Sequence, residues 1–245
     1  MDKGKKAAIG ATLLLVAVVG ARVAMVVHQR HVDETAVAPV AVEAKMNPDD
    51  LVFLKKLRPD SMKDMQQLIG KTLWVSAGGQ LDYFAVAARK ANYAKSEGVL
   101  LGADPLVVKD VIEQVAPKSA TFRIPGGDKQ VLLVFSLPKS DKPTALYAVP
   151  VGYKQDGVYT LQTDEIFFYD DPHILYKHWS AEQWAAIDAH KVIPGMSEKQ
   201  VQLSLGQVSK SDSQAFGNRT VTFDHQGHPV DVVFEKDKAT TIRQD

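Results

Sequence analysis

The sequence predicts an α+β protein with an N-terminal transmembrane helix, a mostly antiparallel β domain with one or two helices in the middle, and a C-terminal two-layer module of order α-α-β-β-β. Three observations lead to this prediction. An apolar run at residues 7–27 follows a basic N-terminus. Apolar segments separated by short turns fill residues 121–169. Capped helices followed by three strand-like segments make up residues 180–242.

The apolar run of residues 7–27 is interrupted by Arg22. About 20 apolar residues span a bilayer as a helix, and Arg22 lies near the far end, where its side chain could reach the interface. We interpret the run as an uncleaved signal anchor, and the alternative is a signal peptide cleaved near Val19-Gly20-Ala21. The anchor predicts a single-pass protein of the bacterial inner membrane, with the N-terminus in the cytoplasm and the body in the periplasm.

Residues 31–45 are rich in Ala, Val, Pro and acidic residues and show no helical or strand period. We interpret them as a linker. The expected segments are therefore a signal anchor at residues 1–30, a linker at 31–45, a middle α+β domain at 46–178 and a C-terminal module at 179–245.

Helices are expected at three places in the middle domain. An Asn-Pro-Asp-Asp start and leucines three residues apart predict a helix over residues 47–57. A second, short helix is expected over residues 61–69, with Asp60 as its cap. The Asp104-Pro105 pair favours an N-cap with Pro at the first helical position. The residues that follow predict a helix to Val115 whose broad apolar stripe packs against a sheet.

The rest of the middle domain predicts strands. Residues 130–137 form a near-continuous apolar run, which is typical of a strand buried on both faces. Gln155-Asp156-Gly157 predicts a hairpin turn. Further strands are expected at residues 71–75, 80–86, 146–151, 159–163 and 165–169.

Two helices open the C-terminal module, at residues 180–191 and 197–205. Each begins with a Ser that is followed three residues later by a Gln, the pattern of a capping box. Met196 and Val201 have the spacing of a hydrophobic staple, and Gly206 stands where a left-handed C-terminal cap is needed. A β-meander with strands at residues 219–224, 230–235 and 239–242 completes the module.

This module resembles the SmpA/OmlA (BamE-like) family, which are small envelope lipoproteins of the outer-membrane β-barrel assembly machine. The resemblance covers about residues 180–245 and implies a BamE-like fold and partners in outer-membrane biogenesis. The chain contains no Cys, so it lacks the lipobox Cys through which members of the family are lipid-anchored. The matching positions are Gly195, Met196, Val201, Leu205, Gly206, Phe223, Gly227 and Phe234.

Composition disfavours some functions and excludes others. The chain has 29 Lys and Arg residues against 29 Asp and Glu residues, whereas a nucleic-acid-binding protein usually carries a basic surplus. The lack of Cys excludes disulfides, thiolate metal sites and a cysteine nucleophile. Because the basic residues are balanced by acidic residues, we expect no nucleic-acid partner.

Polar and aromatic residues are densest between residues 164 and 179. Asp171, His173 and His178 could bind a divalent metal, because carboxylate and imidazole are suitable ligands. Their spacing matches no standard zinc signature, and the segment around Pro172 equally indicates a turn and a helix start. Trp179 and Trp184 are expected to anchor the following helix in a core. No cofactor is expected.

Two functions follow from these observations. The first is a non-enzymatic, membrane-anchored periplasmic protein-interaction or scaffold subunit, in outer-membrane protein assembly or as an accessory subunit of a membrane complex. Its partners would be the lipid bilayer, through residues 7–27, and other envelope or membrane proteins. The alternative is a periplasmic small-ligand or metal-binding protein, or a hydrolase, that uses the middle domain.

Overall fold

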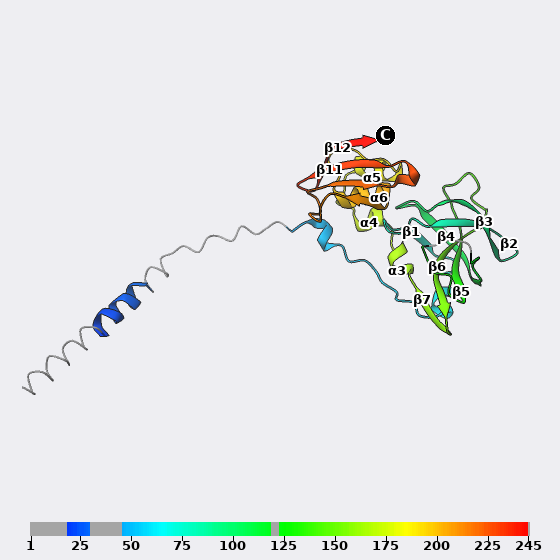
Figure 1. Cartoon of the computed structure of the whole chain (residues 1–245), viewed down its shortest axis with the longest axis horizontal. Helices are drawn as coiled ribbons and strands as arrows, with labels where there is room; N and C mark the ends of the chain where they lie inside the picture. The colour runs from blue at the N-terminus through cyan, green and yellow to red at the C-terminus, as the bar shows by residue number, and fades with distance from the viewer. Residues whose placement is uncertain (1–18, 30–45, 119–122, 245) are drawn as a thin grey trace, which may run out of the picture. The chain divides into compact units, whose positions relative to one another are not determined.

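The computed structural model describes residues 19–29, 46–118 and 123–244, and the chain divides into two units, residues 1–47 and residues 48–245 (Figure 1). The predicted linker at residues 31–45 lies outside the described residues, as does the start of the predicted transmembrane helix, residues 7–18.

In the first unit, the structure describes a helix over residues 19–29 and the two residues 46–47. No helix within the described residues is long and apolar enough to cross a membrane. Arg22 lies within the described helix. The predictions of a transmembrane helix and of a single-pass inner-membrane localisation are therefore wrong.

The second unit contains a large, mostly antiparallel sheet, as predicted for the middle domain. Its strands are β1 (Thr72–Val75), β2 (Asp82–Ala87), β3 (Lys90–Val99), β4 (Pro105–Gln114), β5 (Lys129–Ser136), β6 (Tyr147–Gln155), β7 (Val158–Leu161) and β8 (Phe167–Phe168). Their order is β3-β2-β6-β5-β4-β1-β8, and β7 pairs with β6. We call this part the sheet lobe.

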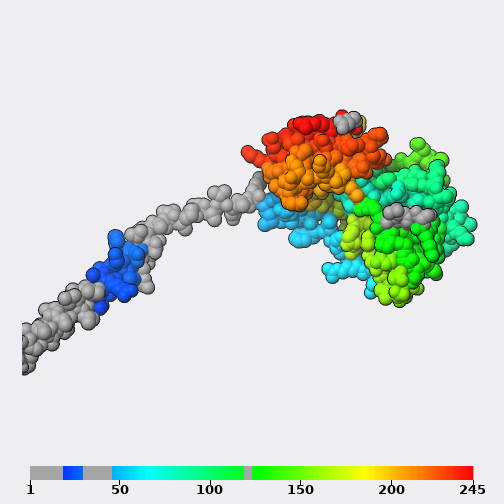
Figure 2. All heavy atoms as spheres, viewed as in Figure 1, coloured from blue at the N-terminus to red at the C-terminus, as the bar shows by residue number. Residues whose placement is uncertain are grey.

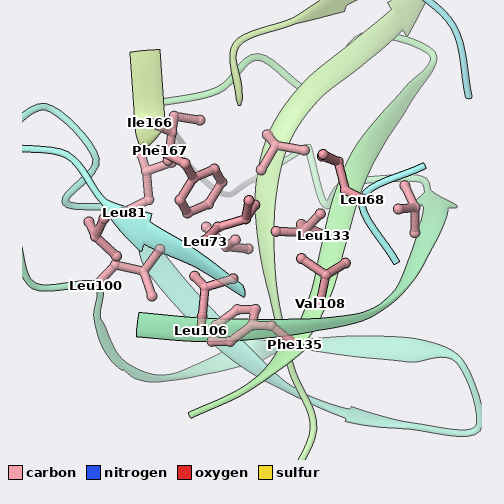
Figure 3. Close-up of a cluster of buried hydrophobic side chains, with 14 of the residues drawn as sticks. Leu68, Leu73, Leu81, Leu100, Leu106, Val108, Leu133, Phe135, Ile166 and Phe167 are labelled. Atoms are coloured by element: carbon pink, nitrogen blue, oxygen red, sulfur yellow. The ribbon is translucent and has the colours of Figure 1, made fainter. Parts of the chain in front are cut away.

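Strand β5 lies at the centre of the sheet lobe, and its residues from Gln130 to Ser136 are all buried. On one face, Leu133 and Phe135 belong to the main core of the lobe (Figure 3). On the other face, Leu132 and Val134 belong to a second, smaller cluster. The prediction of a strand buried on both faces is confirmed.

Residues 105–114 form the strand β4 and not the predicted helix. β4 pairs with β1 on one side and with β5 on the other. Val107, Val108, Val111 and Ile112 are β-branched and fit a pleated, half-buried surface better than a helix. An initial Pro is compatible with both structures, so tertiary pairing decided between them.

The predicted helix over residues 47–57 is also wrong. The chain forms a 3-10 helix, η1 (Pro48–Leu51), and residues 52–60 then have neither helix nor strand structure. Pro59 disfavours helical backbone at the residue before it. The next helix is α2 (Met62–Gln66), and it is capped by Ser61 instead of Asp60. Two short helices, α3 (Thr163–Ile166) and α4 (Pro172–Leu175), precede the C-terminal module.

The C-terminal lobe begins with α5 (Ala181–Asp188) and α6 (Glu198–Leu205), and both capping boxes are present as predicted. Its sheet has the order β12-β11-β10-β9, so the module runs α-α-β-β-β-β and the predicted α-α-β-β-β order is wrong. The unpredicted strand is β9, whose single apolar residue is Val208 and which therefore shows no alternation. The strands are β9 (Val208–Ser211), β10 (Thr220–Phe223), β11 (Val230–Glu235) and β12 (Lys238–Gln244), with η2 (His225–Gly227) between β10 and β11.

The side chains between these helices and strands form a core of their own. Met196 and Val201 are both fully buried, as the hydrophobic staple requires. Gly206 ends α6 with a φ of +91°, but its ψ of −128° differs from the predicted left-handed helical cap.

Close backbone approaches join the two lobes. A Cβ atom on Gly102 would lie 2.0 Å from the carbonyl oxygen of Leu203, so only Gly fits at this contact. A Cβ atom on Gly206 would lie 1.7 Å from Nε2 of Gln80. Both contacts therefore require a Gly on one side, at Gly102 and at Gly206.

Candidate interaction site

The second unit begins with a segment that runs over both lobes, residues 48–60, which we call the strap. Figure 2 shows its light-blue atoms on the surface beside the orange atoms of the C-terminal lobe. Val52 packs against the core of the C-terminal lobe. Leu54 and Lys56 line a hollow of about 100 Å³ whose wall includes Phe167 of the sheet lobe.

Asp49 fixes the beginning of the strap. Its carboxylate Oδ1 accepts the indole N–H of Trp179 at 2.8 Å and lies 2.5 Å from Nε2 of His178. Asp49 and Trp179 are each no more than 9% exposed. The Trp179 ring stacks on Tyr176, with the ring centroids 4.3 Å apart. The strap is thus hydrogen-bonded to the aromatic core of the C-terminal lobe, and the core role predicted for Trp179 is observed.

Asp164 fixes the far end of the strap. Its carboxylate accepts the N–H groups of Leu57 at 3.1 Å and of Arg58 at 3.0 Å, and the hydroxyl of Tyr169 at 2.8 Å. Lys56 Nζ donates to the carbonyl oxygen of Asp164. Arg58 has a φ of +48°, and a left-handed residue of this kind lets successive N–H groups converge on one anion.

These contacts alter the pKa of Asp164. Partial burial raises the pKa, but the hydroxyl of Tyr169, the N–H groups of Arg58 and Leu57 and the charge of Lys56 lower it by more, so the net shift is downward. The contacts therefore favour the ionised carboxylate, which is the form that can accept all of these hydrogen bonds.

Between the two fixed ends, the strap presents apolar side chains to solvent. Phe53 is 86% exposed, and Leu51 is 55% exposed. Ile174 on α4 is 70% exposed, and its neighbour Leu175 lines the same hollow as Leu54. Exposed bulky apolar side chains on an ordered segment are typical of protein–protein contact sites.

The structure separates the residues of the predicted metal site. Nδ1 of His173 lies 2.9 Å from Asp171, and its Nε2 lies 3.2 Å from Asp188, so His173 and Asp171 are together. His178 instead pairs with Asp49. In the described parts of the chain, no group of three or more His, Asp or Glu side chains could hold a metal ion.

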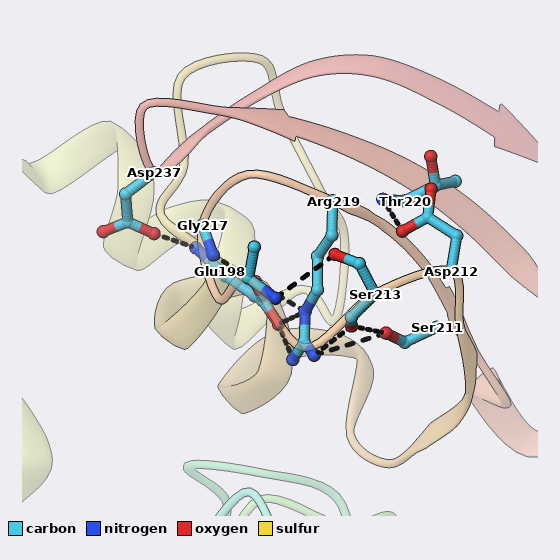
Figure 4. Close-up of polar contacts among 9 residues, drawn as sticks. Glu198, Ser211, Asp212, Ser213, Gly217, Arg219, Thr220 and Asp237 are labelled. Carbon is cyan, nitrogen blue, oxygen red and sulfur yellow. Dashed lines mark hydrogen bonds and ion pairs between the residues drawn. The ribbon is translucent and has the colours of Figure 1, made fainter.

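A separate polar cluster surrounds Glu198 at the start of α6 (Figure 4). Its buried carboxylate accepts Nη2 of Arg219 at 2.6 Å and the N–H of Gly217 at 2.7 Å. Arg219 also donates to the carbonyl oxygen of Ser213 at 2.9 Å. The oxygens of Glu198 are occupied by these donors, so the cluster ties the connection between β9 and β10 to α6 and leaves little room for a ligand.

Sequence reasoning missed the strap as a site. Asp49 and Asp164 were recognised only as part of a helix start and of a polar cluster, because their partners lie more than a hundred residues away. Phe53 gave no separate signal, because it stands four residues before Leu57 and would lie on the same face of the predicted helix.

In comparisons with known proteins, no family model, no curated protein and no solved structure matches this chain.

Proposed function

We propose that this protein is a non-enzymatic, protein-binding subunit that docks a partner protein on the strap. The observation that carries the proposal is Phe53, a bulky apolar side chain that is 86% exposed on the strap. The strap is hydrogen-bonded at its beginning through the Asp49 carboxylate to Trp179, and at its far end through the N–H of Leu57 to Asp164. Burying such a side chain against a partner contributes about 1.5–3 kcal/mol.

Preorganisation supports the same proposal. A free segment would lose conformational entropy on binding, and this loss weakens the complex. The strap is already held by the contacts of Asp49, Val52 and Asp164, so most of its conformational entropy has already been lost during folding. A partner that inserts Phe53 into an apolar pocket would gain the burial with little further ordering.

The class of partner comes from the sequence. The resemblance of residues 180–245 to the SmpA/OmlA (BamE-like) family remains a prediction, and it makes proteins of outer-membrane assembly the first partners to test. The alternative of a metal-binding protein is less well supported, because His178 lies with Asp49 and away from the pair of Asp171 and His173.

Affinity capture with matched variants tests the proposal. The tagged full-length chain is compared with Phe53→Ser and with the control Val158→Ser, which replaces a 67% exposed residue on β7. We expect one partner to be recovered with the wild type and with the control, and to be reduced at least about tenfold with Phe53→Ser. Equal recovery with all three chains, or no recovered partner, would contradict it.

A further inference from the structure

The side chain of Gln80 pairs with the backbone of the C-terminal lobe as a peptide unit would. Its Nε2 donates to the carbonyl oxygen of Leu205 at 3.2 Å, and its Oε1 accepts the N–H of Gln207 at 3.1 Å. A donor and an acceptor from one amide, on residues two apart, reproduce the pairing of a neighbouring strand. Gln80 therefore occupies the place of an added strand just before β9 begins.

Strand β9 continues this edge. It is an edge strand of the C-terminal sheet, and among the described residues it pairs with β10 alone. Val208 and Lys210 are exposed. Four residues of β9 offer about 13 Å of backbone to a further strand.

Two other edge strands, β12 and β3, are each covered at one residue. On β12, the backbone N–H and carbonyl of Ala239 are bonded to Met196 and Gly195, both at 2.8 Å. On β3, the backbone of Ala91 is bonded at both groups to the side-chain amide of Gln114, at 2.8 and 2.9 Å. Such covering is how proteins protect edge strands.

An open hollow of about 340 Å³ lies at the start of β9, and Arg123 is the single charged residue among the described residues of its lining. Nη1 of Arg123 donates to the backbone carbonyl oxygen of Gln80 at 2.8 Å, and its Nη2 donates to that of Gly78 at 3.4 Å. The remaining wall of the hollow is uncharged and includes Ala77, Gln202 and Val208. A ligand here meets one positive charge, and a carboxylate is its natural complement.

We infer that β9 accepts an extended, acidic peptide segment of a partner protein as an additional strand. The peptide backbone continues the pairing that the Gln80 amide begins, and a carboxylate at its end meets Arg123. Main-chain hydrogen bonds supply affinity in this mode of recognition, and the charged end supplies register. The inference goes beyond the strap proposal, because β9 and the strap share no residue.

Disulfide trapping tests the inference in the full-length chain, which has no Cys of its own. Lys210→Cys, as the free thiol, is mixed with the peptide acetyl-Thr-Val-Cys-Val-Thr-Glu-Glu, whose Cys is activated as a mixed disulfide with thionitrobenzoate, so that exchange releases thionitrobenzoate. The counterpart peptide ends in an amidated Lys-Lys and carries the same activated Cys. The control is Lys95→Cys on the exposed edge strand β3. We expect trapping at position 210 to be about tenfold faster with the acidic peptide, and we expect no such preference at position 95.

Three further changes separate strand addition from simple electrostatic attraction. Arg123→Ala should abolish the preference for the acidic peptide at position 210, whereas Phe53→Ser should leave it unchanged. N-methylation of alternate peptide amides should slow trapping in the wild-type background, since it removes backbone donors. Equal trapping of both peptides, or trapping unaffected by N-methylation, would overturn the inference without bearing on the strap.

Discussion

The carboxylate of Asp49 accepts the indole N–H of Trp179 at 2.8 Å, although the two residues are 130 positions apart in the sequence. This hydrogen bond joins the first turn of the second unit to the aromatic core between α4 and α5. The strap is thereby part of the folded second unit. The contribution of its attachment to the stability of the protein can be measured by changing Asp49.

Replacing Asp49 with Ala should destabilise the protein. The change leaves the buried indole N–H of Trp179 without its acceptor, which costs about 1–3 kcal/mol, and we expect the melting temperature to fall by roughly 2–10 °C. Thermal unfolding followed by tryptophan fluorescence measures the effect. Asp50→Ala, at the exposed neighbouring position, is the control, and an equal fall in both variants would contradict the role of Asp49.

The attachment of the strap to Asp164 should weaken in acid. Because the pKa of Asp164 in the folded protein is lowered from its usual 3.8, its contribution is fully present above the pKa of the unfolded chain and is lost as the pH falls through the folded pKa. Hydrogen exchange at the amides of Leu57 and Arg58 should therefore accelerate, relative to the rest of the sheet lobe, at a pH below about 4.

Asp164→Asn should reproduce that loss of protection at neutral pH, because the amide has no charge. Glu165→Gln is the matched control, since it changes the neighbouring carboxylate and none of the bonds to the strap. Slow exchange at both amides in Asp164→Asn would show that the carboxylate does not hold the strap.

Glu198→Ala should be strongly destabilising, because it leaves Arg219, whose side chain is 11% exposed, without its partner. Loss of one member of a buried ion pair costs about 3–5 kcal/mol. Glu97→Ala, which removes a partly exposed pair with Lys95, should cost less than about 1 kcal/mol. Denaturant unfolding compares the two variants, and similar midpoints would contradict the assignment of Glu198 as a structural anchor.

Gly206→Ala should separate backbone strain from steric exclusion at the contact between the lobes. It places a methyl group against Gln80 at a φ of +91°, whereas Gly227→Ala has a similar φ of +83° and open space around it. Gly227→Ala should lose about 1–2 kcal/mol for the backbone. Gly206→Ala, whose ψ of −128° lies outside the left-handed helical region, should lose about 1–3 kcal/mol for the backbone and about 1–3 kcal/mol more for the contact. The added change Gln80→Ala should recover this second part, and equal destabilisation of the two Gly variants would exclude the contact.

Local signals in the sequence were reliable where a few neighbouring residues decide the structure. Ser180 and Ser197 each predicted a capping box with the Gln three residues later, and both boxes are present. The apolar run at residues 130–137 predicted a doubly buried strand, and β5 is one. Each of these depends on contacts within one element or on its hydrophobicity alone.

Predictions that depended on distant partners were less reliable. The apolar residues of β4 fit a helix stripe as well as a buried strand, and pairing with β1 and β5 selected the strand. Strand β9 carries little apolar signal and exists because β10 provides its pairing partner. Nothing in residues 52–60 shows that Asp164 will bind the N–H groups of Leu57 and Arg58.

The position of the strap in the sequence has a consequence for synthesis. The acceptor for Leu57 and Arg58 lies 106 or more residues downstream, and Trp179 follows Asp49 by 130. At about 5–20 residues per second, a ribosome needs roughly 5–25 s to translate that interval. During this time Phe53 and its neighbouring leucines are on a nascent chain with no lobe to hold them, where a chaperone can bind them first.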